Sequence, residues 1–398
     1  MSWPLVKLGD LFKVTSGGTP SRRQLEYYEN GTIPWIKTGD LHNKYVTSAS
    51  EYITQEGLDG SSTRMYPKGT VLVAMYGATI GACSILDIDA CTNQACAAFT
   101  PSEKVDINFL YYLLKQSKST FVKAGSGGAQ PNISATFLKE FKIPLPPLDE
   151  QKRIATILDK ADSVRRKRQQ AIDLAGDFLR SVFLDMFGDP ISNPKGWEVK
   201  KLKEISSKIA SGNTPKGGSK NYVDGGITFL RSQNVWKNKL LLDDVVYIDE
   251  KTHESMSKSS LKYKDILMTK TGRINTENSS LGRAALYLGD DGKANLNGHV
   301  YFIRLVENVL HEFVVFILTT KEYRDYIRSV CVGGIDKRQL NKDHLEEFPI
   351  IYPPKEMQEQ FVEKVNIARS MLEKAKLGLK ESEQMFNGLS QKAFAGEL

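Results

Sequence analysis

Two glycine-rich loops, at residues 125–132 and 332–339, are flanked by side chains that could read the edges of DNA bases. Amide and guanidinium groups can form paired hydrogen bonds with adenine and guanine, whose major-groove edges offer matching donors and acceptors. Three more polar side chains follow strand-like segments and join this set. Its members are Tyr76, Lys123, Gln130 and Asn132 in the first half of the chain, and Lys270, Arg273, Lys337, Arg338 and Gln339 in the second. We favour this set as the base-reading candidates.

Two further sets of polar residues could contact DNA. One lies in and after a Ser-Gly-x-Thr-Pro turn that occurs twice, where cations and exposed backbone N–H groups suit phosphates. It comprises Arg22 and Arg23 after the first turn and Lys216 and Lys220 after the second. An ordinary polar turn explains these residues equally well. The other set, Lys37, Arg231 and Gln233, falls within a repeated motif, so a role in maintaining the fold explains it at least as well as sequence reading.

The usual motifs of catalysis are missing from the sequence. It contains no Gly-x-x-x-x-Gly-Lys-Ser/Thr phosphate loop, and Tyr352-Pro353-Pro354 lacks the polar residue that precedes the prolines in adenine methyltransferases. The five histidines have no zinc-binding spacing, and the four cysteines include no Cys-x-x-Cys pair, which predicts buried, reduced thiols. Gly188-Asp189-Pro190 is interpreted as a helix stop rather than part of a nuclease site. We expect no catalysis by this chain alone, no metal and no cofactor.

The elements that must position the candidate residues occur twice. The repeated segments are Trp3–Leu8 and Trp197–Leu202 at the openings, Ser16–Pro20 and Ser211–Pro215 at the turns, Ile33–Leu41 and Ile227–Val235 further on, and Phe141–Gln151 and Phe348–Gln358 at the ends. A unit of this length is a whole domain, so the pattern indicates a tandem duplication rather than a solenoid of short repeats. Two alike domains on one chain would suit a long target with two separated reading sites.

Each copy combines a globular part with a long helix. Short strand-like runs, turns and a few helices make up the globular part, which predicts an α+β fold. A long helix is predicted after a proline-rich segment in each copy, because proline excludes the helix before that point. We predict a first globular domain at residues 1–147, a central long helix at 148–188, a second globular domain at 189–353 and a C-terminal long helix at 354–398.

The two long helices are expected to pair as an antiparallel coiled coil. Apolar residues recur at heptad spacing, and small alanines among them allow two helix backbones to approach closely. The a and d positions include Ile154, Ile157, Ala161, Val164, Ala171 and Phe178 in the first helix and Val365, Ala368, Leu372, Ala375, Leu379 and Phe386 in the second, while Leu158, Ile172, Leu179 and Met186 widen the first stripe. Equivalent helices that pair across a pseudo-twofold axis run antiparallel. In the alternative, each helix packs on its own domain.

Composition and charge are those of an ordinary globular protein. The chain has 398 residues, 40% of them hydrophobic and 25% charged, with a formal net charge of +7 and a pI near 8.9. This modest positive excess is compatible with a polyanionic partner but does not demand one. The sequence contains no apolar run of about 18 residues, so no membrane-spanning segment is predicted. The N-terminus has no signal-like region. The expected location is the cytoplasm.

Taken together, these motifs make the chain resemble the specificity subunit of type I restriction-modification systems over essentially its whole length. The resemblance rests on Ile33–Leu41, Leu145–Gln151, Phe187–Asp189 and Gln391–Leu398, with the two Trp-initiated openings and the two Ser-Gly-x-Thr-Pro turns. Each motif is weak alone, and their order and duplication make the match strong. The second copy departs where Lys355-Glu356-Met357 replaces Leu148-Asp149-Glu150, which leaves the pattern intact.

The resemblance implies a non-catalytic subunit that recognises a bipartite DNA sequence, one half per target-recognition domain. It implies that the helix pair fixes the spacer and docks two modification subunits, which methylate adenine, and that ATP-driven restriction subunits join for cleavage. The implied partners are therefore double-stranded DNA, modification subunits and restriction subunits, with no membrane. An assembly scaffold that binds only proteins is the rival class, and it would show no salt-dependent DNA affinity. An enzyme of the fused restriction type is disfavoured by the missing methyltransferase motifs.

Overall fold

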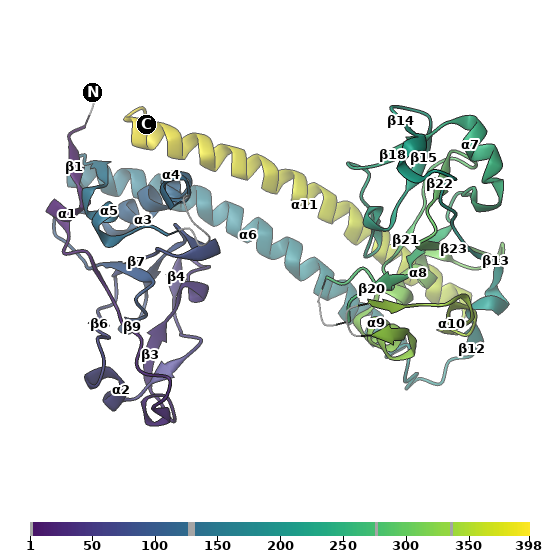
Figure 1. Ribbon diagram of the computed structural model, residues 1–398, viewed down its shortest axis with the longest axis horizontal. Helices are drawn as coiled ribbons and strands as arrows, with labels where there is room; N and C mark the ends of the chain where they lie inside the picture. The colour runs from purple at the N-terminus through teal and green to yellow at the C-terminus, as the bar shows by residue number, and fades with distance from the viewer. Residues whose placement is uncertain (1–2, 126–131, 275–277, 335–336) are drawn as a thin grey trace. The chain divides into compact units, whose positions relative to one another are not determined.

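The computed structural model describes residues 3–125, 132–274, 278–334 and 337–398. The chain divides into two compact units, and each of its two long helices contributes residues to both (Figure 1). Unit 1 consists of residues 1–171 and 375–398, and unit 2 of residues 172–374. Gln130, a predicted base-reading residue, lies outside the described residues.

Two sheets form the globular part of unit 1. Its strands are β1 (Leu5–Lys7), β2 (Thr15–Ser16), β3 (Ile33–Ile36), β4 (Tyr45–Val46), β5 (Tyr52–Ile53), β6 (Met65–Tyr66), β7 (Val71–Ala74), β8 (Cys83–Leu86), β9 (Ala90–Thr92), β10 (Cys96–Phe99) and β11 (Lys142–Pro144). One sheet has the order β2-β10-β7-β8-β4 and the other β5-β3-β9-β6, while β1 pairs with β11. Along β7, Val71 and Val73 join one apolar cluster and Leu72 and Ala74 another, because alternate side chains point to opposite faces. The strand is therefore buried on both faces.

Short helices accompany both sheets of unit 1. They are α1 (Leu8–Leu11), α2 (Gln55–Asp59), α3 (Ile107–Gln116), α4 (Lys118–Gly125) and α5 (Ala135–Glu140). Helix α2 packs on the smaller sheet, where Leu58 joins Trp35 and Ile53, and side chains of α3 pack on the larger one. The carboxylate of Asp106 caps α3 by accepting a hydrogen bond from the Phe109 backbone N–H at 2.9 Å, which satisfies one of the unpaired donors of its first turn. Phe109 and Leu113 of α3 then pack in the same apolar cluster as Val73.

Unit 2 repeats this architecture with additions. Its strands are β12 (Val199–Lys201), β13 (Ser206–Ser211), β14 (Tyr222–Val223), β15 (Ile227–Leu230), β16 (Val235–Trp236), β17 (Lys239–Leu240), β18 (Val246–Ile248), β19 (Ile266–Thr269), β20 (Thr271–Gly272), β21 (Ala284–Leu286), β22 (Ala294–Leu296), β23 (Val300–Leu305), β24 (Val332–Gly334), β25 (Lys337–Gln339) and β26 (Pro349–Ile351). Its short helices are α7 (Glu250–Ser255), α8 (His311–Thr319), α9 (Lys321–Val330) and α10 (Lys342–Glu346). The order β13-β23-β19-β21 matches β2-β10-β7-β8 of unit 1, and the parallel pair β15–β22 of unit 2 corresponds to β3–β9 of unit 1, which has a further parallel pair, β4–β8. The α+β prediction is confirmed.

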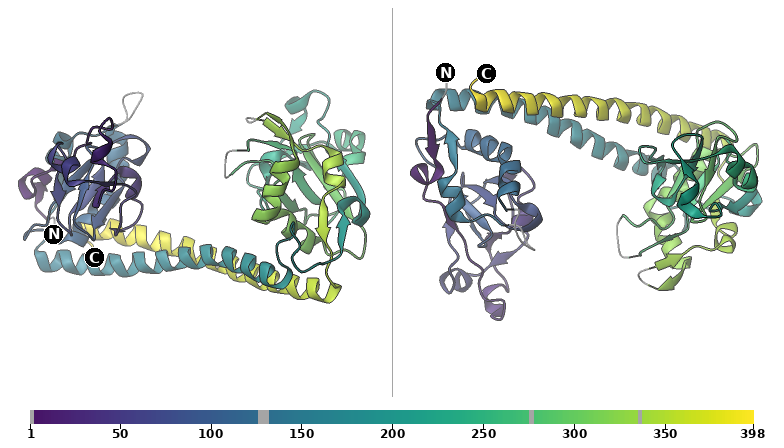
Figure 2. Two further views of the ribbon diagram at one scale, coloured as in Figure 1. Left: turned by 90° about the horizontal axis from the view of Figure 1, so that it is seen from below. Right: turned by 45° about the horizontal axis from the view of Figure 1, so that its top comes forward.

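The long helices, α6 (Leu148–Phe187) and α11 (Lys355–Ala395), run antiparallel where they meet in unit 1. The Arg153 guanidinium donates to the backbone carbonyl of Leu398 at 2.8 Å, and Arg168 donates to the Ser382 hydroxyl at 2.6 Å. Later residues of α6 thus contact earlier residues of α11, and both views of Figure 2 show the two helices side by side here. Gly378 permits the close approach, because an added Cβ would lie 2.9 Å from the Arg168 Nη1 atom.

Both helices also join the apolar core of unit 1. The predicted helix pair and the alternative, in which each helix packs on a globular domain, therefore both hold in part. Ile154 and Leu158 of α6 and Phe386 of α11 are buried in one cluster with the side chains of α3. In the same way, Phe183 of α6 and Phe361 of α11 meet in the core of unit 2, with their ring centroids 5.3 Å apart. The helices therefore pack on each other and on the globular parts.

The predicted register of α6 is wrong at Val164, Ala171 and Phe178. These side chains are exposed, Val164 by 42% and Phe178 by 60%. The buried stripe instead follows Ile154, Leu158, Ala161, Ile172, Ala175, Leu179, Val182 and Met186, all buried or half-buried. At these places the inward-facing side chain lies four residues after the heptad a position rather than three, as for Ile172 and Leu179. Residues at either spacing lie on one face of a helix. The predicted positions in α11 are all buried or half-buried.

No helix within the described part of the chain is both long and apolar enough to span a lipid bilayer.

Candidate nucleic-acid interface

A small sheet in unit 2 gathers the candidates that the sequence favoured there. β25 lies between β20 and β24, and Gly272 of β20 pairs with Arg338 of β25. Arg273 follows β20 directly and is exposed. The residues gathered on these neighbouring segments are Lys270, Arg273, Lys337, Arg338 and Gln339. Sequence positions almost 70 apart thus contribute to one polar surface, which we call the unit 2 hairpin surface.

Side chains alternate along β25 between solvent and the body of unit 2. Lys337 and Gln339 are exposed, whereas Arg338 is half-buried and its guanidinium donates to the Cys331 carbonyl at 2.9 Å. The Nε atom of Arg338 is buried and has no hydrogen-bond partner among the described residues. Lys337 and Gln339 are therefore positioned to meet a partner, while Arg338 supports the hairpin from behind.

Lys270 enters the hairpin surface from the end of β19. Its ammonium lies 4.2 Å from the centroid of the Tyr301 ring, within the range of a cation–π interaction. Burial lowers the pKa of this lysine, because desolvation disfavours the charged form. A cation that is already partly stripped of water gives up less hydration when it contacts a phosphate.

The described residues of unit 1 include a counterpart of this arrangement. Tyr76 and Asn132 form an isolated antiparallel bridge, and the Ile133 N–H donates to the Met75 carbonyl at 2.9 Å. In unit 2 the Leu340 N–H donates to the Lys270 carbonyl at the same distance. Tyr76 is 44% exposed, and Asn132 is exposed beside it. The structure thus brings these two predicted residues together, with Lys123 exposed on the preceding helix α4.

A second cluster in unit 1 centres on the Glu51 carboxylate. Arg22 binds it with both terminal nitrogens, one of them at 2.9 Å, and Lys37 binds it at 2.8 Å. The Arg22 guanidinium also stacks over the Tyr28 ring, 4.3 Å from its centroid. Because of the hydrogen bond from Arg22, followed by that from Lys37, the pKa of Glu51 falls to about 2 although burial opposes the shift. These cations are therefore held in fixed positions.

Unit 2 repeats this cluster around Asp244. Arg231 donates to the Asp244 backbone carbonyl at 2.7 Å and lies 3.1 Å from its carboxylate, while Gln233 donates to the same carboxylate at 2.6 Å. Lys37 and Arg231 occupy equivalent places, each directly before a short 3-10 turn. Within these turns the side chains of Asp40 and Asn234 accept the Lys37 and Arg231 backbone N–H groups, each at 2.8 Å. The repeated motif thus has a clear role in maintaining the fold.

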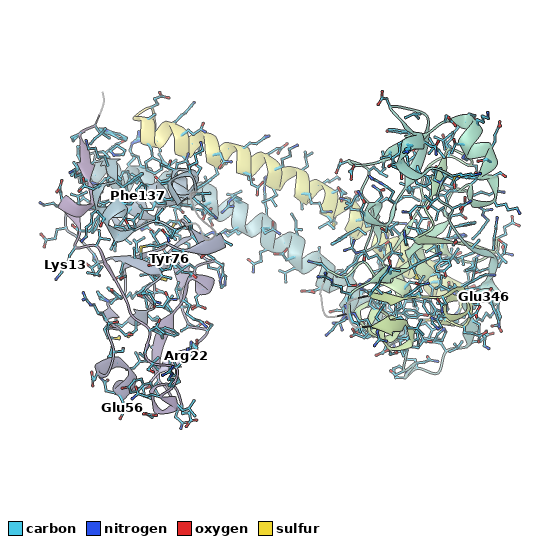
Figure 3. All side chains as sticks on the ribbon, in the orientation of Figure 1. Lys13, Arg22, Glu56, Tyr76, Phe137 and Glu346 are labelled. Atoms are coloured by element: carbon cyan, nitrogen blue, oxygen red, sulfur yellow. The ribbon has the colours of Figure 1, made fainter. Side chains whose placement is uncertain are left out.

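The remaining candidates, Arg23, Lys216 and Lys220, are exposed. Arg23 follows Arg22, and Lys216 and Lys220 lie in the turn after β13. Figure 3 shows that Arg22 lies at the α2 end of unit 1, with Glu56, whereas Tyr76 lies nearer the long helices. The predicted residues of unit 1 therefore form two surfaces rather than one.

Sequence reasoning missed two buried arginines of unit 2, Arg283 and Arg324. Only 8% of Arg283 and 6% of Arg324 is exposed, and both donate to the backbone carbonyl of Ser279. One signal was present, because Arg324 stands between Tyr323 and Ile327 on the apolar face of α9. An arginine at such a position usually has a structural partner.

The described residues contain no cluster of histidine, cysteine and carboxylate side chains suited to a metal ion. All four cysteines are buried and unpaired. Burial raises the pKa of both Cys83 and Cys96 to about 12, so their thiols stay protonated and unreactive near neutral pH.

Comparisons with known protein families and sequences gave a consistent result. The type I restriction modification DNA specificity domain matches twice, at residues 2–174 and 194–377. The chain is 29% identical over 385 residues to the type I restriction enzyme MjaIX specificity subunit of Methanocaldococcus jannaschii, covering 90% of this chain and 85% of that protein. It is 33% identical over 162 residues to the EcoR124I/EcoR124II specificity subunit of Escherichia coli, covering 39% and 40% of the two chains.

Solved structures share the fold. The type I restriction-modification S subunit from M. genitalium superposes with a TM-score of 0.57 at 17% identity, covering 98% of this chain and 96% of that one. A chain from a study of complex assembly and conformational transition of the type I R-M system gives a TM-score of 0.58 at 17% identity, covering 100% and 98%.

Proposed function

The chain belongs to the type I restriction modification DNA specificity family, and from this premise we propose that it is the DNA sequence-specificity subunit of a type I restriction-modification complex. The observation that carries the proposal is the double family match, at 2–174 and 194–377, on two units that repeat one strand order. Each unit also presents polar side chains at the equivalent strand pairing, Tyr76–Asn132 or β20–β25.

Each globular domain reads one half of a bipartite DNA site. We assign the two target-recognition domains to residues 1–147 and 189–353. A base pair is identified through hydrogen bonds to its edges in the groove, and Gln339, Asn132 and Arg273 are exposed side chains of the types that form them. Two linked readers gain affinity through effective concentration when their separation suits the duplex. The long helices at 148–188 and 354–398 set that separation.

The helix pair also docks two modification subunits. Support comes from large apolar side chains that α6 and α11 leave exposed, which is unusual for a helix surface that faces only water. They include Val164, Leu174 and Phe178 on α6 and Ile367, Met371, Leu377 and Met385 on α11, with exposed fractions between 42% and 66%. Restriction subunits then join this core for cleavage.

The subunit itself is non-catalytic and needs no cofactor. Its partner subunits carry out methylation and cleavage, and this chain recognises the DNA sequence at which they act. We place this activity in the cytoplasm, where the DNA substrate is.

The test is a comparison of genome-wide adenine methylation in cells with and without the gene. Deletion is expected to abolish methylation at one bipartite motif, and reintroduction of the gene should restore it. An unchanged methylation pattern would reject the proposal.

A binding measurement separates this function from that of a protein scaffold. The chain, assembled with its modification subunits, should bind a duplex that carries the motif, and log K should fall linearly with log salt concentration, because phosphate contacts release counterions. A scaffold would give no such slope and no preference for the motif.

A further inference from the structure

We propose that Arg283 and Arg324 are positioning residues for DNA reading by unit 2: they hold the loop at residues 278–282 against β20 and thereby set base discrimination in one half-site. This inference rests on the proposed function. Neither arginine is exposed enough to read a base itself, so its influence acts through the loop and the hairpin surface beside it.

The two guanidinium groups bind the loop from its inner side. Arg283 donates from Nε to the Ser279 carbonyl at 3.0 Å and also binds the Asn278 carbonyl. Arg324 donates to the Gly282 carbonyl at 3.1 Å and to the Ser279 carbonyl at 3.4 Å. Two cations thus hold the loop at three of its backbone carbonyls. Hydrogen bonds from a charged donor are stronger than those between neutral groups.

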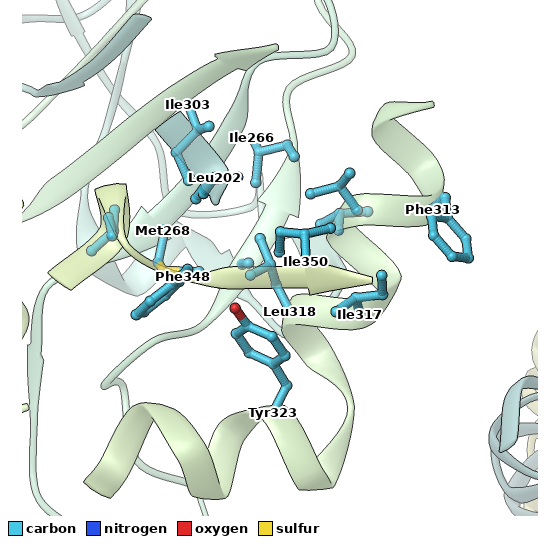
Figure 4. Packing of buried hydrophobic residues seen from close by; sticks show 14 of the residues in the cluster. Leu202, Ile266, Met268, Ile303, Phe313, Ile317, Leu318, Tyr323, Phe348 and Ile350 are labelled. Atoms are coloured by element: carbon cyan, nitrogen blue, oxygen red, sulfur yellow. The ribbon is translucent and has the colours of Figure 1, made fainter. Parts of the chain in front are cut away.

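Both arginines stand on firm supports. Arg283 lies with its guanidinium carbon 3.8 Å from the centroid of the Trp236 ring, which fixes its plane. Arg324 follows Tyr323, whose fully buried ring anchors α9 in the core of unit 2, as Figure 4 shows, and whose hydroxyl donates to the Pro349 carbonyl at 3.1 Å. The loop position is therefore tied to the core rather than to solvent-exposed contacts.

The loop in turn packs tightly against β20. A Cβ added to Gly272 would lie 2.3 Å from the Leu281 nitrogen and 2.7 Å from the Ser279 hydroxyl. The Ser280 hydroxyl donates to the Thr271 carbonyl at 2.7 Å. Because β20 pairs with β25, a displacement of this loop would move the strand that supports Arg338 and its exposed neighbours.

Unit 1 has no loop of this length at the equivalent place. There β8 begins at Cys83, shortly after Gly77, whereas in unit 2 β21 begins at Ala284, well after Gly272. Because the longer loop belongs to unit 2, loss of the contacts from Arg283 and Arg324 should affect only the half-site that unit 2 reads. The half-site read by unit 1 serves as an internal control.

The positive charges of Arg283 and Arg324 also favour DNA binding at the hairpin surface. Burial lowers the pKa of Arg324 to about 10, followed by repulsion from Arg328 and Arg283, so the group is still protonated near neutral pH. Among the described residues, the hydrogen-bond acceptors of Arg283 and Arg324 are neutral backbone carbonyls rather than carboxylates. Their positive field therefore extends to the hairpin surface, where it favours a nearby phosphate.

The experiment compares three variants of the chain assembled with its modification subunits: Arg324→Met, Arg324→Lys and the matched control Arg328→Met. Arg328 lies one turn further along α9 and pairs with Asp325 at 2.6 Å, so its substitution removes the same charge from the same helix without touching the loop. Binding is measured with duplexes that carry the motif found by methylation sequencing, and with single base-pair changes in each half-site.

Arg324→Met is expected to reduce discrimination in one half-site by about tenfold and to leave the other half-site unchanged, since one misplaced bidentate contact costs about that much. Arg324→Lys keeps the charge but cannot reach both carbonyls, so it should give an intermediate loss. Arg328→Met should match the wild type. Thermal unfolding of each complex shows whether Arg324→Met is folded, and if it is not, Arg324→Lys carries the test.

Unchanged discrimination in Arg324→Lys and Arg324→Met, or an equal loss in both half-sites, would overturn the inference. A wild-type complex that shows no base discrimination at all would instead remove the proposed function on which the inference depends.

Discussion

A carboxylate beside a candidate DNA-binding cation alters what that cation can offer. Glu51 shares its one negative charge between Arg22 and Lys37, so this cluster keeps a net positive charge of one. Among the residues that the structure describes, Asp244 forms an ion pair with Arg231 alone, and that cluster is neutral. Equivalent positions of the two copies thus differ in their attraction for phosphate. The first cluster is the better candidate for a backbone contact with DNA.

Replacing Glu51 with Gln should destabilise the protein near neutral pH by about 1–2 kcal/mol, a range that allows for solvent screening of a partly exposed group. The folded state lowers the pKa of Glu51 from about 4.5 to about 2, so its contribution is complete above the unfolded pKa. It is then lost as the pH falls toward about 2. The difference between wild type and Glu51→Gln, measured by urea unfolding, should therefore shrink between pH 5 and pH 3. Glu103→Gln, at an exposed position, is the control, and a difference that grows on acidification would contradict the prediction.

At the residue scale, sequence patterns could predict side-chain chemistry but not partners. The pairing of Tyr76 with Asn132 depends on a strand bridge between segments far apart in the chain. The repeated Lys37 and Arg231 positions were recognised as candidates for a fold-maintaining role, yet Glu51 and Asp244 lie outside the repeated motif and were not foreseen. Arg283 and Arg324 were missed because charged residues are rarely this deeply buried.

The long helix α6 shows how an element can be predicted while its face is not. Proline before the helix and Gly188 after it marked its bounds closely, since both residues act locally. The buried face depends on neighbours that the sequence does not reveal. Apolar residues occur both three and four positions after the heptad a positions. Packing in the two cores turns the residue four positions later inward. Phe178 is consequently exposed, whereas Phe183 is not.

Two phenylalanine substitutions on α6 should separate docking from stability. Phe183→Ala removes a fully buried ring that packs against Phe361, and large truncations of this kind cost about 3–5 kcal/mol. Phe178→Ala changes a ring that is 60% exposed and should cost less than about 0.5 kcal/mol. Phe178→Ala should nevertheless weaken assembly with the modification subunits, as measured by analytical ultracentrifugation. A large loss of stability in Phe178→Ala would show that this residue packs within the chain instead.

At the scale of the whole molecule, the duplication explains why fold class could be predicted well. Each motif appears twice in the same order, so the pattern of one α+β domain can be recognised in two independent stretches of sequence. The structure has the same repeat, since the order β2-β10-β7-β8 corresponds to β13-β23-β19-β21. The differences between the copies were harder to foresee. The loop before β21 is longer than the segment before β8, and an insertion of this kind leaves no periodic pattern to recognise.

The proposed spacer role makes a prediction about the long helices. An insertion of four residues, about one helical turn, in the exposed stretch of α6 near Gln170 should change the number of unspecified base pairs between the half-sites. Both half-sites should keep their sequences, because the reading domains are unaltered. Methylation sequencing of cells that carry the variant measures both properties at once. Recovery of the original gap, or of new half-site bases, would contradict the spacer role.

Residues 375–398 complete the core of unit 1, where Phe386 packs on Tyr112 with ring centroids 5.9 Å apart and Phe394 packs on Phe109 at 5.6 Å. On the ribosome, this segment emerges only after all of unit 2 has been synthesised. The nascent first domain must therefore wait with part of its apolar surface uncovered, and chaperones have an opportunity to bind there. Maturation of the amino-terminal half thus follows, rather than precedes, translation of the carboxy-terminal half.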